Sequence, residues 1–72
     1  MTALRDLVFR ALDNSVENGY GEESKSGGLE TVANNLLDYD AEIFEAASKG
    51  DDFLDGMDLI PHIEAWRKER AG

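Results

Sequence analysis

Residues 38–58 read DYDAEIFEAASKGDDFLDGMD, and this stretch decides how the helices of the chain are divided. It contains eight carboxylates and a single base, Lys49. Apolar side chains recur between the acids, so the stretch has residues for a buried face as well as residues that can cap helix ends. So much negative charge on a sequence that is able to fold requires an explanation beyond folding.

The position that divides the helices is Asp40. From Leu29 onward the residues before it repeat an apolar stripe at helical spacing. A continuous helix would carry that stripe across Asp40 and bury its carboxylate without a nearby base, which is unfavourable. We therefore expect a break at residues 38–40, with Asp40 as the N-cap of a short helix over residues 41–48. A single helix over residues 29–48, with Asp40 at its edge, is the alternative.

Apolar spacing predicts two further helices. The first covers about residues 3–16, and the last covers about residues 58–70, with Asp58 as its cap and Pro61 in its first turn. Alternating apolar and polar runs typical of strands are missing. The expected fold is an all-α bundle of three to four short helices in a single domain over residues 1–72. The expected core residues are Leu7, Leu12, Leu36, Phe44, Ile63 and Trp66.

Residues 17–28 read ENGYGEESKSGG and contain four of the seven glycines. Asn-Gly and Gly-Gly pairs are turn signals, and glycine weakens any regular element. We expect a flexible loop here, with Tyr20 holding the loop against the core; an exposed Tyr20 that contacts a partner is the alternative. The glycines are not followed by Gly-Lys-Ser/Thr, so the segment does not match a phosphate-binding loop.

Composition limits the class of protein. The chain has 72 residues, and 42% of them are hydrophobic, which is too many for a disordered acidic tail even at a net charge of −9. Without cysteine it can form neither disulfides nor thiolate metal sites, and charged residues interrupt the apolar N-terminal run that a signal peptide would need. The expectation is a cytoplasmic protein that does not bind membranes. Direct binding to nucleic acid is disfavoured as well, because it needs clustered Lys and Arg.

No set of residues indicates a cofactor, a metal or a catalytic site. Residues 51–62 place Asp51, Asp55 and Gly56 at positions 1, 5 and 6 of a calcium-binding loop, but His62 stands where the bidentate glutamate is required. His62 also lacks the histidine or cysteine partners of a zinc site. A lone histidine without a placed nucleophile does not make a catalytic triad. We therefore expect neither a bound cofactor nor enzymatic activity.

The charge is distributed unevenly along the chain. Between Ala11 and Trp66 there are fourteen acids and two bases. An acidic body with a basic tip is therefore expected, and helix-borne carboxylates could compete for the Lys and Arg of a nucleic-acid-binding protein. The ordinary interpretation is that the acids serve solubility and helix capping. The bases near the two ends are Arg5, Arg10, Arg67, Lys68 and Arg70.

A short, cysteine-free, acidic helical chain with LLDYDAEIFEAASKGDDFLDGMD at its centre and IEAWRKER near its end resembles the small inhibitor proteins that phages carry against host enzymes. Anti-CRISPR proteins and other DNA mimics belong to that class. The resemblance covers size, charge and helicity over the whole chain, and not a sequence motif. It implies a stoichiometric inhibitor in the host cytoplasm that occupies the basic groove of a nuclease or of a nucleic-acid-guided complex.

The acidic segment 38–58 is the expected contact surface with a basic protein partner, its acids supplying charge and its aromatic residues supplying anchors. The predicted partner-binding residues are Asp38, Tyr39, Asp40, Glu42, Glu45, Asp51, Asp52, Phe53 and Asp55. The competing hypothesis is a structural or regulatory module that pairs with itself as a homodimer or with a partner helix, the acids serving only solubility. Charge-mediated binding would weaken with salt, whereas apolar assembly would persist.

Overall fold

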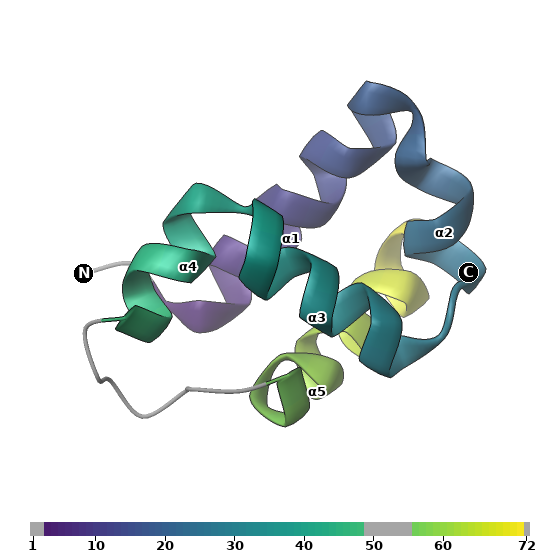
Figure 1. Cartoon of the computed structure of the whole chain (residues 1–72). Helices are drawn as coiled ribbons and strands as arrows, with labels where there is room; N and C mark the ends of the chain where they lie inside the picture. The colour runs from purple at the N-terminus through teal and green to yellow at the C-terminus, as the bar shows by residue number, and fades with distance from the viewer. Residues whose placement is uncertain (1–2, 49–55, 72) are drawn as a thin grey trace.

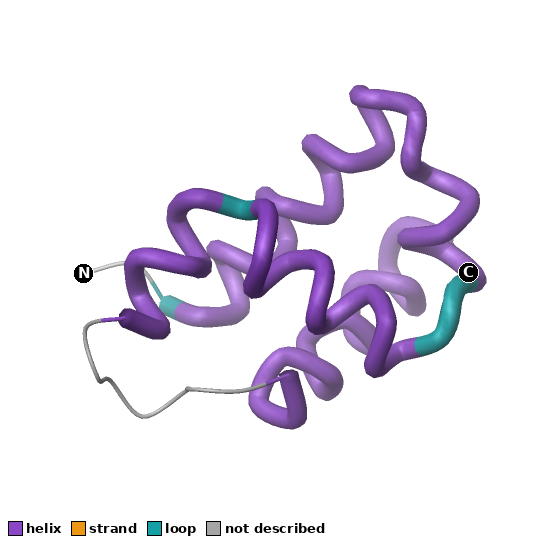
Figure 2. The backbone as a smooth tube through the Cα atoms, in the orientation of Figure 1, coloured by secondary structure: helices purple, strands orange, loops and turns teal. Residues whose placement is uncertain are grey.

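The computed structural model describes residues 3–48 and 56–71, and nearly all of them are helical (Figure 1). Figure 2 shows that only short connections interrupt the helices in this part of the chain. The prediction of a small all-α bundle is confirmed. The helical elements in chain order are α1 (Leu4–Ser15), η1 (Val16–Tyr20), α2 (Gly21–Ser26), α3 (Leu29–Tyr39), α4 (Ala41–Ser48), α5 (Gly56–Trp66) and η2 (Arg67–Ala71).

The core forms where α5 packs against both α1 and α3. Leu12, Ile63 and Trp66 are the central side chains, each with at most 1% of its surface exposed. They were expected in the core, as were Leu7 and Leu36, which are also buried. The apolar stripes of α1, α3 and α5 thus meet one another, as the three- and four-residue spacing predicts.

Phe44 was expected in the core, and this prediction is wrong because its side chain is 58% exposed. Its neighbour Ile43 is completely buried instead. Successive residues of a helix point about 100° apart, so only one of the two can face the interior of the bundle. Ala46 follows Ile43 by three residues and packs against the core, which fixes the buried face of α4.

The break predicted at residues 38–40 is confirmed at Asp40, while Asp38 and Tyr39 still belong to α3. Asp40 has extended backbone angles (φ −86°, ψ 116°) between α3 and α4, which excludes a single helix over residues 29–48. Its side chain accepts a hydrogen bond from the backbone N–H of Ile43 to Oδ1 (3.0 Å), and its carbonyl accepts one from Phe44 (2.9 Å). Asp40 is therefore the N-cap of α4, as the sequence indicates.

The expectation of a loop over residues 17–28 is wrong, because η1 and α2 make most of this segment helical. The chain turns at Gly19, where a positive φ of 93° breaks the helical path, and then resumes an α-helix at Gly21. Glycine adopts a positive φ without a steric penalty, so it permits the kink that lets α2 fold back. Tyr20 is 66% exposed, and it therefore does not hold this segment against the core.

The last helix begins at Gly56, two residues before the expected cap. Asp58 consequently lies in the first turn of α5 rather than capping it. Pro61 lies inside the helix, beyond its first turn, where its missing N–H cannot bond to the carbonyl four residues earlier. Helicity continues to residue 71 through η2, so the predicted end of this segment is close to the observed one.

The C-terminal segment ties α1 to α5 through Asp13. The indole Nε1–H of Trp66 donates a hydrogen bond to Asp13 Oδ1 (2.9 Å), and Arg70 donates from Nε to the same oxygen (3.3 Å). Trp66 is 1% exposed, so this carboxylate satisfies a buried donor. Asp13 of α1 thus binds two side chains from the C-terminal segment.

Arg67 ties the same C-terminal segment to α2. Its guanidinium donates from Nε to the carbonyl of Ser24 (3.0 Å) and from an Nη to the carbonyl of Gly27 (2.6 Å). The last carbonyls of a helix have no partner within the helix, so Arg67 caps the C-terminal end of α2.

Among the described residues, no helix is long and apolar enough to cross a lipid bilayer.

Candidate functional site

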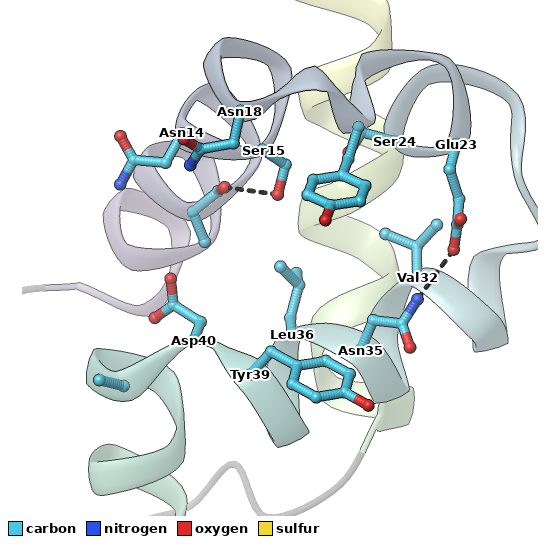
Figure 3. A pocket seen from close by; sticks show the side chains of 13 residues that line it. Asn14, Ser15, Asn18, Glu23, Ser24, Val32, Asn35, Leu36, Tyr39 and Asp40 are labelled. Atoms are coloured by element: carbon cyan, nitrogen blue, oxygen red, sulfur yellow. Dashed lines mark hydrogen bonds between the residues drawn. The ribbon is translucent and has the colours of Figure 1, made fainter.

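A cleft of about 590 Å³ opens between α3 on one side and α1, η1 and α2 on the other (Figure 3). Its volume lies in the range of about 300–1,000 Å³ that is usual for ligand pockets. The cleft exists because the kink at Gly19 turns the chain, so that α2 does not continue α1 and a space remains beside α3. The residues that line it therefore come from segments far apart in the sequence.

The floor of the cleft is apolar. Val32 and Leu36 belong to the buried stripe of α3, and Figure 3 shows their side chains between the α1 side and the α2 side of the cleft. Ala11, from the buried stripe of α1, adds a small side chain to the same floor. The small size of Ala11 leaves space that a larger residue would fill.

Side-chain amides line both walls. Asn14 and Asn18 project from α1 and η1, one helical turn apart, and Asn35 projects from α3 (Figure 3). An amide can donate through its NH₂ group and accept through its oxygen, so these walls offer hydrogen bonds of both kinds. Ser15 is less available, because its hydroxyl already donates to the carbonyl of Ala11 (3.1 Å).

Two carboxylates lie on opposite sides of the cleft in Figure 3, Asp40 on one side and Glu23 on the other. Each is held in place through one oxygen: Asp40 Oδ1 accepts the cap bond from Ile43, and Glu23 Oε1 accepts from the Asn35 amide (2.8 Å). Within the described residues, no hydrogen bond holds the second oxygen of either group. Lysine, arginine and histidine are missing from the described lining, so its formal charge is negative.

Two tyrosines complete the lining. Tyr20 is 66% exposed and Tyr39 is 83% exposed. A tyrosine ring that is mostly exposed has a face available for stacking and a hydroxyl available for hydrogen bonding. Stacking and hydrogen bonding are the chemistry that this cleft offers. In the described part of the chain, no group of three or more His, Cys, Asp or Glu residues is placed to hold a metal ion.

The structure brings two of the predicted partner-binding residues, Tyr39 and Asp40, into the cleft. Asp38 and Glu45 are exposed on α3 and α4 outside it. Glu42 is also outside the cleft, and its carboxylate binds Arg10 (2.9 Å). The other four predicted residues lie outside the part of the chain that the structure describes: Asp51, Asp52, Phe53 and Asp55.

Sequence reasoning missed the amide walls and Glu23. The only local signal was the four-residue spacing of Asn14 and Asn18, which places both on one face of a helix. Asn35 and Glu23 gave no such signal, because they meet only through the fold of α2 against α3. Tyr20 was considered as an exposed contact residue, and its exposure fits that alternative.

Of the five bases of the expected basic tip, Lys68 is exposed, and the four arginines bind groups of the molecule itself. Arg5 pairs with Glu69 (2.6 Å) and lies 4.0 Å from the centre of the Phe9 ring, and Arg10 pairs with Glu42 (2.9 Å). The other two arginines hold Asp13 and the end of α2, as described above. The arginines thus join the helices.

Comparison of the chain with models of protein families, with curated proteins and with solved structures gives no match. The function of the protein is therefore inferred from its own residues and their arrangement.

Proposed function

We propose that the chain is a protein-binding module that engages the basic surface of a nucleic-acid-processing protein and acts as a stoichiometric inhibitor. The observation that carries this proposal is the unequal use of the two kinds of charge. All four arginines bind groups of the molecule itself, and of the described bases only the exposed Lys25 and Lys68 have no ion pair, whereas five exposed carboxylates have no ion pair or hydrogen bond within the described residues. These carboxylates are Glu17, Glu22, Glu30, Asp38 and Glu64.

A partner would therefore meet a predominantly negative surface, in a chain whose net charge is −9. Surfaces of one sign accelerate and orient the association with surfaces of the opposite sign. A groove that binds nucleic acid is a strongly basic surface of this kind, since it neutralises phosphates with Lys and Arg. A rigid acidic helical protein can occupy such a groove and exclude the nucleic acid.

The test begins with the immobilised full chain and a nuclease-treated bacterial lysate, washed at low and at high salt. The expected result is capture of a nucleic-acid-binding protein that leaves at high salt, because salt screens exposed charges. The purified partner is then mixed with its DNA or RNA and increasing amounts of the chain. Release of the nucleic acid at a one-to-one ratio supports the proposal. A ternary complex that retains the nucleic acid, or capture that resists salt, contradicts it.

The second candidate function is self-association or binding of a partner helix through apolar contacts. The observation that favours it is the exposure of large apolar side chains: Tyr39 is 83% exposed, Phe44 58% and Met57 67%. Large apolar side chains on the surface offer contacts that a second apolar surface could bury. Light scattering of the purified chain at two salt concentrations separates the functions, because an apolar dimer persists or strengthens at high salt.

A further inference from the structure

We infer that the cleft beside α3 is a subsite for an arginine side chain of the partner protein. This inference rests on the proposed function and deepens it, because it names the group that a basic partner would insert. Three independent properties of the cleft support it: the sign and placement of its charges, its aromatic lining and the acceptors on its walls.

The first property is the charge. Glu23 and Asp40 bring two carboxylates to the cleft, and the described lining contains no cation that would neutralise them. Each carboxylate is already oriented by one hydrogen bond, from Asn35 and from Ile43 respectively. Groups that are held in place before binding lose less side-chain entropy when a ligand arrives. A cationic side chain is therefore the complementary occupant.

The second property is the pair of tyrosine rings, and it distinguishes arginine from lysine. Tyr20 and Tyr39 are the aromatic residues of the described lining, and both side chains are mostly exposed, so their ring faces are accessible. The guanidinium of arginine is planar and weakly hydrated, so it stacks on aromatic faces, whereas the ammonium of lysine is a compact and strongly hydrated charge. This lining hence favours arginine.

The third property is the number of acceptors. Arginine carries five N–H donors in a fixed plane and no acceptor. The side-chain oxygens of Asn14, Asn18 and Asn35 add acceptors to the two carboxylates, and the apolar floor at Leu36 suits the methylene stem of the side chain. The volume of about 590 Å³ accommodates the side chain together with part of its backbone. Arginine is also among the residues enriched at the centres of protein interfaces.

The experiment is a titration of the isotope-labelled full chain with the peptide Ac-Gly-Arg-Gly-NH₂, followed by NMR. The side-chain amide signals of Asn14, Asn18 and Asn35 are expected to shift and saturate. The citrulline analogue, which keeps the shape and loses the charge, should not produce these shifts, and the lysine analogue should bind more weakly. Equal shifts with the citrulline peptide, or no saturable shift with the arginine peptide, would overturn the inference.

Two variants with the same change of charge locate the site. Glu23→Gln keeps an oxygen that can accept from Asn35 and removes one charge from the cleft, and it should weaken the arginine peptide about tenfold. Glu64→Gln removes an exposed charge on α5 outside the cleft and should change the affinity less than about twofold. Equal weakening by both variants would assign the effect to net charge and overturn the subsite.

The subsite and the proposed function can fail separately. A basic partner that binds Glu23→Gln and the parent chain with equal affinity leaves the proposed function standing and overturns the subsite. Specific binding of the arginine peptide without salt-sensitive capture of any basic protein supports the subsite and overturns the inhibitor proposal.

Discussion

Asp13 accepts hydrogen bonds from two side chains of the C-terminal segment, and its removal tests how much that carboxylate stabilises the fold. Asp13→Ala leaves the buried indole N–H of Trp66 without its acceptor, so we expect a loss of about 1–3 kcal/mol in the free energy of unfolding. Urea denaturation followed by circular dichroism measures it. The control is Asp6→Ala, whose carboxylate lies 3.7 Å from Arg5 on the surface and should change stability by less than about 1 kcal/mol. Equal effects would contradict the structural role of Asp13.

Two glycines only two residues apart should respond in opposite ways to the same substitution. Gly19 has a φ of 93°, so Gly19→Ala forces a strained backbone and should destabilise the fold by about 1–2 kcal/mol. Gly21 is helical (φ −62°, ψ −35°), and a Cβ there would lie 3.4 Å from the side chain of Val16, an ordinary contact. Gly21→Ala should therefore stabilise the fold by about 0.4–1 kcal/mol. Thermal melts of both variants measure the two changes in stability. If Gly19→Ala stabilises the fold, residue 19 does not have the positive φ that the kink requires.

At the level of elements, the separation of α3 from α4 depends on the Asp40 cap. Asp40→Ala removes the acceptor for the Ile43 N–H and should cost about 0.5–2 kcal/mol, whereas Asp40→Asn keeps a capping oxygen and should retain most of the stability. Chemical denaturation of the two variants side by side measures the difference. If alanine and asparagine are equivalent at this position, the cap contributes nothing and the helix break has another cause.

The helices α1, α3 and α4 could be predicted from the sequence because of their apolar spacing, and in α4 the capping residue agrees with that spacing. The Asp40 break is the clearest case, since a buried carboxylate and a continuous stripe are incompatible. Phe44 was misplaced because two adjacent apolar residues compete for one inward position, and spacing alone does not select between them. Ile43 is the one of the two whose side chain faces the core, and Phe44 is left exposed.

The helix α2 could not be predicted, because tertiary contacts override the low helix propensity of Gly21 and the turn signals of the glycines on either side of the helix. Arg67 caps its end from 40 residues away in the sequence, and no local pattern reports such a contact. The cleft was missed for the same reason, since α1, η1, α2 and α3 all contribute to it. Of the described lining, Tyr39, Asp40 and Ala41 belong to the acidic segment 38–58.

For the whole molecule, the question is whether binding depends on total charge or on where the charge lies. Two triple variants remove three negative charges each: Asp51→Asn, Asp52→Asn and Asp55→Asn in one, and Glu17→Gln, Glu22→Gln and Glu30→Gln in the other. We expect the first to abolish capture of the basic partner and the second to weaken it less, because the sequence predicts the contact within residues 38–58, while the exposed carboxylates elsewhere add to the overall negative charge. Capture assays, with circular dichroism to confirm retained helicity, make the comparison. Unchanged capture by the first variant would exclude the electrostatic mechanism.

The central position of α5 has a consequence for how the protein is made. Translation releases α1, α2, α3 and α4 before α5, yet α5 is the helix on which α1 and α3 pack, and Arg67 at its end closes α2. Until α5 leaves the ribosome, the apolar faces of α1 and α3 lack the helix that covers them. Such nascent chains are exposed to chaperones and proteases. Folding is therefore expected to follow the synthesis of α5, so the cleft and the acidic surface form together, after the last helix has emerged.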